Sequence, residues 1–206
     1  LEFNLLANQV QLDIFEQYFY DISQFGKLLG NDTEYSDMLN ILEEKISIFE
    51  RFDQAFAVTN GIGTLPNHYR LGALFFNNGT DLIEIELVNK KEVQLLNQTP
   101  LTIPTTTRPI FVKTSGTTIQ IYPATISSGV SCNLIAIPRK VEWGYVVTNE
   151  KALYNPGAST NFELHKSEET TLVMRILELA GIIMDKPQIV QIAGQEDLQK
   201  IQQEKA

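Results

Sequence analysis

The spacing of apolar residues changes partway along the chain, and this change constrains the fold more than any other feature. Over residues 1–60 apolar side chains recur at steps of three and four, which places them on one side of a helix. They form two stripes, Val10, Ile14, Tyr18, Ile22, Phe25 and Leu29, and then Met38, Leu42, Ile46, Phe49, Phe52 and Phe56. Residues 30–32 (GND) interrupt the pattern. The sequence therefore predicts an αα-hairpin whose second helix ends near Val58.

After Pro66 the apolar spacing becomes two, which is typical of strands with one buried face. Ile83, Ile85 and Leu87 alternate with glutamates. Further strands are predicted at residues 69–76, 110–112, 119–121, 130–137 and 143–147, with a short helix at 91–96, and the intervening Asn-Gly and Ser-Gly pairs indicate hairpin turns. We expect a mainly antiparallel β-sheet or sandwich in this region.

The last part of the chain returns to helical spacing. Ser167 is the expected N-cap of a helix that buries Leu172, Ile176, Leu177 and Ala180 and ends at Gly181. A further helix is predicted from Pro187 towards Lys205. Its second half is polar, with Leu198 and Ile201 alone on one side. Because so sparse a helix is marginal in isolation, we expect Leu198 and Ile201 to dock against another subunit.

The predicted fold class is therefore α+β, with three regions. Residues 1–60 form an N-terminal helical hairpin, residues 61–165 a central β-rich domain, and residues 166–206 the C-terminal helices and docking arm. Of the net charge of −9, the first region carries −8, from 11 acidic and 3 basic side chains. Acidic surfaces repel phosphate, so this charge argues against a protein that binds nucleic acid along most of its surface.

The residues capable of catalysis or metal binding have simpler interpretations. Glu163 and His165 share a face of a possible strand, but no spaced cluster supplies the remaining ligands of a metal site. Cys132 lies in an apolar alternation that is typical of a buried thiol. Three carboxylate pairs also have structural interpretations. Glu43–Glu44 is interpreted as part of a solvated helix face and Glu84/Glu86 as the outer face of a strand. Glu168–Glu169 is interpreted as a complement to a helix dipole. We therefore predict no catalytic, cofactor-binding or metal site, and no enzyme.

A series of short motifs covers roughly residues 65–183, more than half of the chain. They are LPNHYRL at 65–71, PLTIPT at 100–105, RPIF at 108–111, IQIYP at 119–123, IPR at 137–139, VEWGY at 141–145 and STNFELH at 159–165. In order and spacing this series resembles the portal-proximal neck ring (head–tail adaptor) proteins of crAss-like podoviruses, which are tailed bacteriophages.

The resemblance implies a non-enzymatic virion component that is assembled in the bacterial host cytoplasm. It implies a homo-oligomeric, twelve-fold ring in the neck or tail, between the portal protein and other ring proteins, around the DNA channel. The genome would pass through without sequence-specific binding, and no membrane or cofactor is implied. If the acidic first region lines the channel, it keeps DNA sliding; if it faces outward, it aids solubility.

Two other classes of function stay open. The first is a β-sandwich binding module for glycan or receptor recognition on a virion or cell surface, which predicts an exposed aromatic cluster, with Trp143 as its one candidate. The second is a small enzyme whose site combines Cys132, Glu163 and His165. Replacing these three residues with alanine abolishes function only in the second case.

Overall fold

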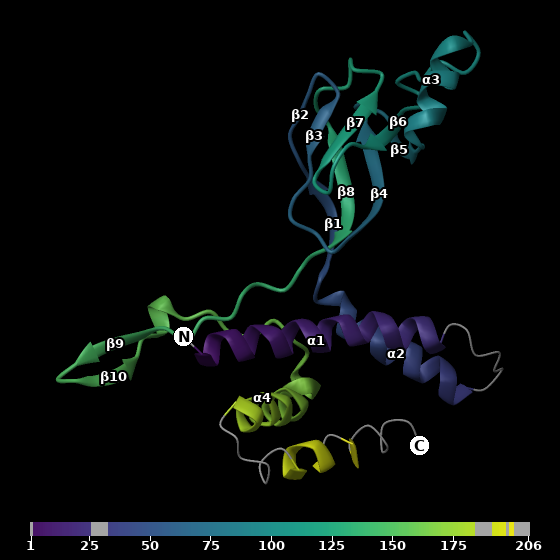
Figure 1. Ribbon diagram of the computed structural model, residues 1–206. Coiled ribbons are helices and arrows are strands. Elements are labelled where there is room, and N and C mark those ends of the chain that lie inside the picture. Colours follow the sequence, from purple (N-terminus) through teal and green to yellow (C-terminus); the bar gives the residue numbers. More distant parts are fainter. Residues whose placement is uncertain (1, 26–32, 184–190, 197, 200–206) are drawn as a thin grey trace. The chain divides into compact units, whose positions relative to one another are not determined.

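The computed structural model describes residues 2–25, 33–183, 191–196, 198 and 199. It confirms an α+β fold with helices at both ends of the chain and a mainly antiparallel sheet between them (Figure 1). Two compact units are present: unit 1 comprises Leu1–Ile48 and Pro138–Ala206, and unit 2 comprises Phe49–Ile137. This division differs from the three expected regions, because the N-terminal hairpin and the C-terminal helices share one unit.

Unit 2 is built on one curled sheet of eight strands in the order β1-β8-β4-β5-β6-β7-β3-β2. All neighbours are antiparallel except β5 and β6, so the sheet is a single mixed sheet and not a sandwich. The strands are β1 (Glu50–Ala55), β2 (Val58–Thr59), β3 (Ile62–Thr64), β4 (Arg70–Asn77), β5 (Leu82–Leu87), β6 (Ile110–Lys113), β7 (Thr118–Tyr122) and β8 (Val130–Ile135), and helix α3 (Lys90–Gln98) follows β5. The hydrophobic core of unit 2 contains Leu74, Ile85, Phe111, Ile121 and Cys132.

The hairpins that the sequence predicts in unit 2 are present. Asn77 pairs with Leu82 across the turn between β4 and β5, and Lys113 pairs with Ile119 between β6 and β7. The glutamates of β5 are exposed and Ile85 is buried, as the two-residue alternation predicts, although Leu87 is exposed. The predicted helix at 91–96 is confirmed as the core of α3.

The second predicted helix is too long. Helix α2 (Thr33–Ser47) stops before Phe49, and the following residues form β1. Glu50 and Ala55 of β1 pair with Ile135 and Ser131 of β8, with a bulge in which Asp53 has φ = 51°. Phenylalanines spaced by three and four mimic a helical stripe, but backbone pairing with β8 determines the structure here.

Unit 1 is organised around α1 (Glu2–Phe25), which packs against both α2 and α4 (Glu169–Ile183) (Figure 1). The expected helical hairpin is thus confirmed with a shorter second arm. The buried apolar side chains of unit 1 include Ala7, Val10, Ile14, Phe15, Tyr18, Leu42, Ile46, Val141, Leu172 and Ala193. Several expectations for the last region are wrong: α4 continues through Gly181, and Leu177 is 45% exposed.

The start of α4 also differs from the expectation. A 3-10 turn, η2 (Lys166–Glu168), precedes the helix, and the Ser167 N–H donates to Nδ1 of His165 at 3.3 Å. Glu168 is buried and its Oε1 lies 2.6 Å from Nζ of Lys45 on α2. Glu168 therefore joins two elements of unit 1 by an ion pair, instead of only complementing a helix dipole.

Candidate functional site

The most unusual feature of unit 1 is a two-stranded ribbon formed by β9 (Tyr145–Thr148) and β10 (Lys151–Tyr154). All eight strand residues are exposed. The connecting residues, Asn149 and Glu150, have φ of 49° and 62°, the left-handed pair of a type I′ hairpin turn. The sequence predicts a strand at 143–147, close to β9, but no strand at the position of β10. We call residues 143–154 the β-ribbon.

One face of the β-ribbon is aromatic. Directly opposed residues of an antiparallel pair share a face, and Tyr145 is opposite Tyr154, with Val147 opposite Ala152. Trp143 extends this face, because its ring stacks on Tyr145 with centroids 5.6 Å apart and planes at 30°. Trp143, Tyr145 and Tyr154 are between 43% and 54% exposed, which is high for large aromatic side chains.

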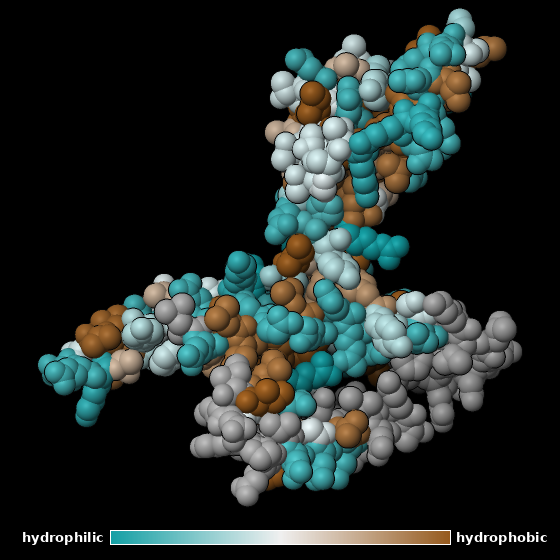
Figure 2. All heavy atoms as spheres, in the orientation of Figure 1, coloured by the Kyte–Doolittle hydropathy of each residue, from teal (hydrophilic) through white to brown (hydrophobic). Residues whose placement is uncertain are grey.

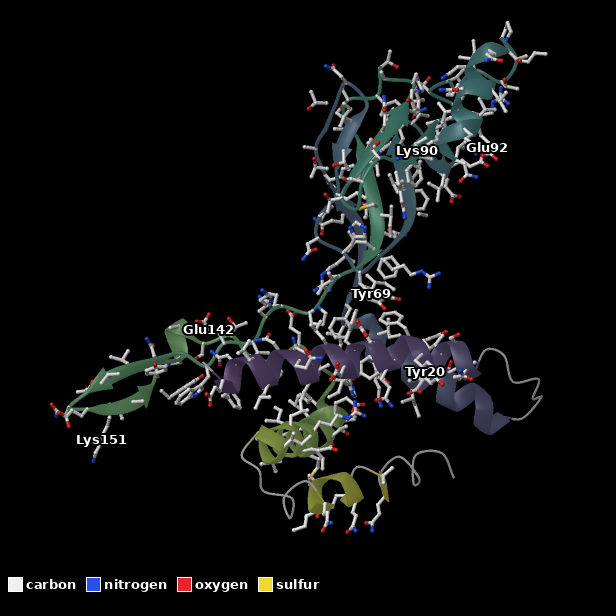
Figure 3. The ribbon with its side chains drawn as sticks, in the orientation of Figure 1. Tyr20, Tyr69, Lys90, Glu92, Glu142 and Lys151 are labelled. Atoms are coloured by element: carbon white, nitrogen blue, oxygen red, sulfur yellow. The ribbon has the colours of Figure 1, made fainter. Side chains whose placement is uncertain are left out.

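The other face of the β-ribbon also carries apolar side chains. Val146 is opposite Leu153 and Thr148 is opposite Lys151, and Val146 and Leu153 are about half exposed. Brown, hydrophobic residues are visible on the ribbon in Figure 2, and Figure 3 shows Lys151 at its far end. An isolated hairpin is marginally stable in water. A ribbon with apolar side chains on both faces is thus suited to packing against another surface.

The base of the β-ribbon is fixed by a compact set of hydrogen bonds. The Gly144 N–H donates to Ser159 Oγ at 3.0 Å, and the Asn155 N–H donates to the Gly144 carbonyl at 3.0 Å. Ser159 Oγ in turn donates to the Asn155 carbonyl at 2.7 Å. A Cβ on Gly144 would lie 2.5 Å from the Ala158 carbonyl oxygen, a contact with backbone that no rotamer relieves. Only glycine fits at this position.

Three amide side chains of α1 fasten the segment that leads into the β-ribbon. Asn8 forms two bonds with the Val141 backbone, Nδ2 to the carbonyl at 2.9 Å and Oδ1 from the N–H at 2.8 Å. Asn4 Oδ1 accepts from the Trp143 N–H at 2.9 Å. Gln11, 1% exposed, donates to the Arg139 carbonyl at 2.8 Å.

These amide side chains form the hydrogen bonds that a neighbouring strand would otherwise provide. The extended segment at residues 139–143 can therefore lie along α1 with its backbone N–H and carbonyl groups bonded. The apolar spacing in the sequence does not identify these three amides. The sequence feature that could have identified them is the spacing of Asn4, Asn8 and Gln11, which places all three on one face of α1.

The residues considered for catalysis have other roles. The Glu163 carboxylate accepts two hydrogen bonds from Arg139, one from its backbone N–H at 2.8 Å and one from the side-chain Nε at 2.5 Å. His165 Nδ1 lies 2.9 Å from Ser167 Oγ. Cys132 lies in unit 2 and is fully buried, and burial raises its pKa from 9.0 to about 11, so the thiolate is scarce at neutral pH. Within the described ranges, no three His, Cys, Asp or Glu side chains are grouped so as to hold a metal ion.

Unit 2 carries an open groove over β1, β8, β4 and β5. Its largest lining side chains are Phe52, Phe56, Phe75 and Leu82. Of these, Phe52 is 71% exposed and Leu82 is 62% exposed. Among the residues that line it, only Asp53 is charged. We call this surface the sheet groove. It is the second exposed apolar feature that the sequence did not predict.

The predicted docking residues are only partly covered by the structure. Residues 191–196 are helical and Ala193 is buried, while Leu198 is 60% exposed. Ile201 lies outside the described residues. Docking through Leu198 and Ile201 therefore stays a prediction.

Comparison of the sequence with models of known protein families found no match. A search of the curated proteins also found no match. None of the helices in the described part of the chain is long and apolar enough to cross a membrane.

Proposed function

We propose that this chain is a non-enzymatic structural component of a phage virion, which forms a ring in the neck or tail and connects portal to tail around the DNA channel. The observation that supports this proposal is the β-ribbon, whose two faces expose Trp143, Tyr145, Val146, Val147, Leu153 and Tyr154. Monomeric proteins rarely expose so large a contiguous set of apolar side chains. A rigidly anchored apolar arm is instead typical of a subunit that holds a neighbour.

The anchoring of the β-ribbon supports an assembly role further. The hydrogen bonds of Asn4, Asn8 and Gln11 fix the segment that leads into the β-ribbon to α1, and the Gly144–Ser159 hydrogen bond fixes the base of the β-ribbon to the segment that follows it. A fixed base lowers the conformational entropy that is lost when an arm binds, so the arm is preorganised for its partner.

The distribution of charge is compatible with a subunit that surrounds passing DNA. Unit 1 holds 19 acidic and 10 basic side chains, a net charge of −9, whereas unit 2 holds six of each and is neutral. An acidic inner wall repels the phosphate backbone and binds no particular sequence, so the genome slides. The same charge on the outer wall would serve solubility. Both arrangements fit the proposal, and labelling of the assembled particle distinguishes them.

The test is to purify the full chain, alone and with portal protein, and to measure its mass by light scattering and its shape by electron microscopy. We expect closed rings with a central opening. Gly144→Ala should abolish ring formation, because the added Cβ collides with the Ala158 backbone and displaces the β-ribbon. Gly157→Ala is the matched control, since its Cβ meets only Asn155 Oδ1 at 3.5 Å. A chain that stays monomeric and joins neither portal nor tail assemblies would refute the proposal.

A second candidate function is favoured by one observation, the aromatic face of the β-ribbon. Exposed aromatic rings such as those of Trp143 and Tyr145, which stack on each other with planes at 30°, can also pack against sugar rings or receptor side chains. A glycan- or receptor-binding module is therefore the alternative. This face belongs to unit 1, not to a β-sandwich. A monomer whose Trp143 fluorescence changes on addition of oligosaccharides, with the response lost in Tyr145→Ala, would favour this alternative over the ring.

A further inference from the structure

We propose that the β-ribbon of one copy docks in the sheet groove of a second copy of the same chain. This inference rests on the proposed function, since it names the surfaces by which neighbouring subunits in the ring hold one another. The contact is between unit 1 of one subunit and unit 2 of the next.

The two surfaces match in chemistry. The β-ribbon presents Tyr145, Tyr154 and Val147 on one face, and the sheet groove presents Phe52, Phe75 and Leu82. Aromatic side chains on both sides allow offset and edge-to-face ring contacts, which stabilise an interface beyond the burial of area. The bulge at Asp53 interrupts β1, the edge strand beside the groove. We therefore expect packing through side chains rather than addition of a ninth strand.

Charge favours unit 2 of a neighbour over its unit 1 as the receiving surface. The β-ribbon contains one acid and one base, Glu150 and Lys151, so it is neutral, as is unit 2. Unit 1 carries the whole net charge of −9. Two copies that met through their unit 1 surfaces would bring like charges together, whereas ribbon-to-groove contact brings together neutral surfaces. Lys151 at the end of the ribbon also offers a partner for Asp53 of the groove.

The area of the β-ribbon is adequate for a specific contact. From the exposed fractions of Trp143, Tyr145, Val147 and Tyr154, the docking face offers about 450 Å² of largely apolar surface. Each partner in an interface of standard size contributes about 800 Å². Turn and polar strand atoms at the rim supply the remainder.

The arrangement also produces the symmetry of a ring. An arm and its receptor that lie at different places on one chain form a head-to-tail contact, in which each copy is donor to one neighbour and acceptor for the other. Such contacts close into a ring when a whole number of the rotations that relate neighbouring copies adds up to 360°.

The test is chemical crosslinking, with a short bismaleimide, between two differently tagged variants that each carry one introduced cysteine. Val147→Cys places a thiol on the β-ribbon, and Leu82→Cys places one in the sheet groove. Native Cys132 is fully buried and its thiol is protonated at neutral pH, so it stays unreactive in the folded chain. We expect dimers that carry both tags when the two variants are mixed, disassembled and reassembled. Ala152→Cys, directly opposite Val147 on the same face, provides a second variant if Val147→Cys misfolds.

The matched control replaces Leu95 of α3, which is 64% exposed and lies in unit 2 but outside the groove. Val147→Cys mixed with Leu95→Cys should give no dimer carrying both tags. The mass of each assembly is measured in parallel by light scattering. Rings that form without the Val147–Leu82 crosslink would overturn this inference and leave the proposed function standing, whereas persistent monomers would overturn both. A crosslink found only within a doubly substituted chain would also overturn it.

Discussion

Replacing Gln11 with leucine should destabilise unit 1 strongly, although the two side chains are similar in size. Gln11 is 1% exposed, donates to the Arg139 carbonyl at 2.8 Å and accepts from the Glu163 N–H at 3.0 Å. Leucine provides neither group, so two backbone groups lose these partners in the interior. Each such loss costs about 1–3 kcal/mol, and the apolar side chain offsets part of it, which leaves about 2–4 kcal/mol.

The assay is urea denaturation followed by tryptophan fluorescence. The chain has one tryptophan, Trp143. Its backbone N–H donates to the Asn4 side chain on α1, so its fluorescence reports on unit 1. With a denaturant dependence of about 2 kcal/mol per molar urea, the midpoint should fall by about 1–2 M.

The control is Gln9→Leu on the same helix. Gln9 is exposed and bonds only to Asp13 one turn later, at 2.9 Å, an interaction that contributes about 0.2–0.5 kcal/mol. If the midpoint of Gln11→Leu lies within about 0.3 M of this control, the claim that amide side chains fasten residues 139–143 to α1 is wrong.

Three further predictions concern single side chains. Glu168→Gln leaves Lys45 without its carboxylate in a largely buried site and should lower the free energy of unfolding of unit 1 by about 3 kcal/mol, measured in urea, whereas exposed Glu169→Gln should have little effect. Because burial raises the pKa of Cys132 from 9.0 to about 11, the protonated thiol stabilises the fold below pH 9, and this stabilisation is lost as the pH rises through 11. Circular dichroism should therefore show the free energy of unfolding of unit 2 falling about 2 kcal/mol further in the wild type than in Cys132→Ala between pH 9 and pH 11. Glu150→Gly should slow amide hydrogen exchange in the β-ribbon by about two- to fivefold, because glycine adopts the left-handed angles of this turn without strain; faster exchange would contradict this account of the turn.

The elements that the sequence predicts well are those whose side-chain pattern and backbone environment agree. The Ile83–Leu87 alternation identifies β5, and the Val10–Tyr18 stripe identifies the buried face of α1. The pattern fails after Ser47, where phenylalanines at helical spacing continue into a segment that pairs with β8. A distant strand supplies the backbone partners there, and no local spacing reveals it.

The candidate site was harder to predict than the fold. β10 consists of four residues, Lys151–Tyr154, without the alternation of a half-buried strand, because neither of its faces is buried. Trp143 is recognisable as an exposed aromatic candidate, but its stacking on Tyr145 depends on the hairpin. The sheet groove combines side chains from β1, β4 and β5, so it exists only after the sheet has formed.

The chain passes from unit 1 into unit 2 after Ile48 and returns after Ile137, and the two ends of unit 2 lie side by side. The Ala136 N–H donates to the Phe49 carbonyl at 2.8 Å, and Glu50 pairs with Ile135. Residues 49–137 therefore constitute a continuous insert with adjoining ends, placed inside a helical scaffold that both flanking stretches complete. Because the ends of such an insert adjoin, it can be replaced as one piece while the chain on either side keeps its own fold.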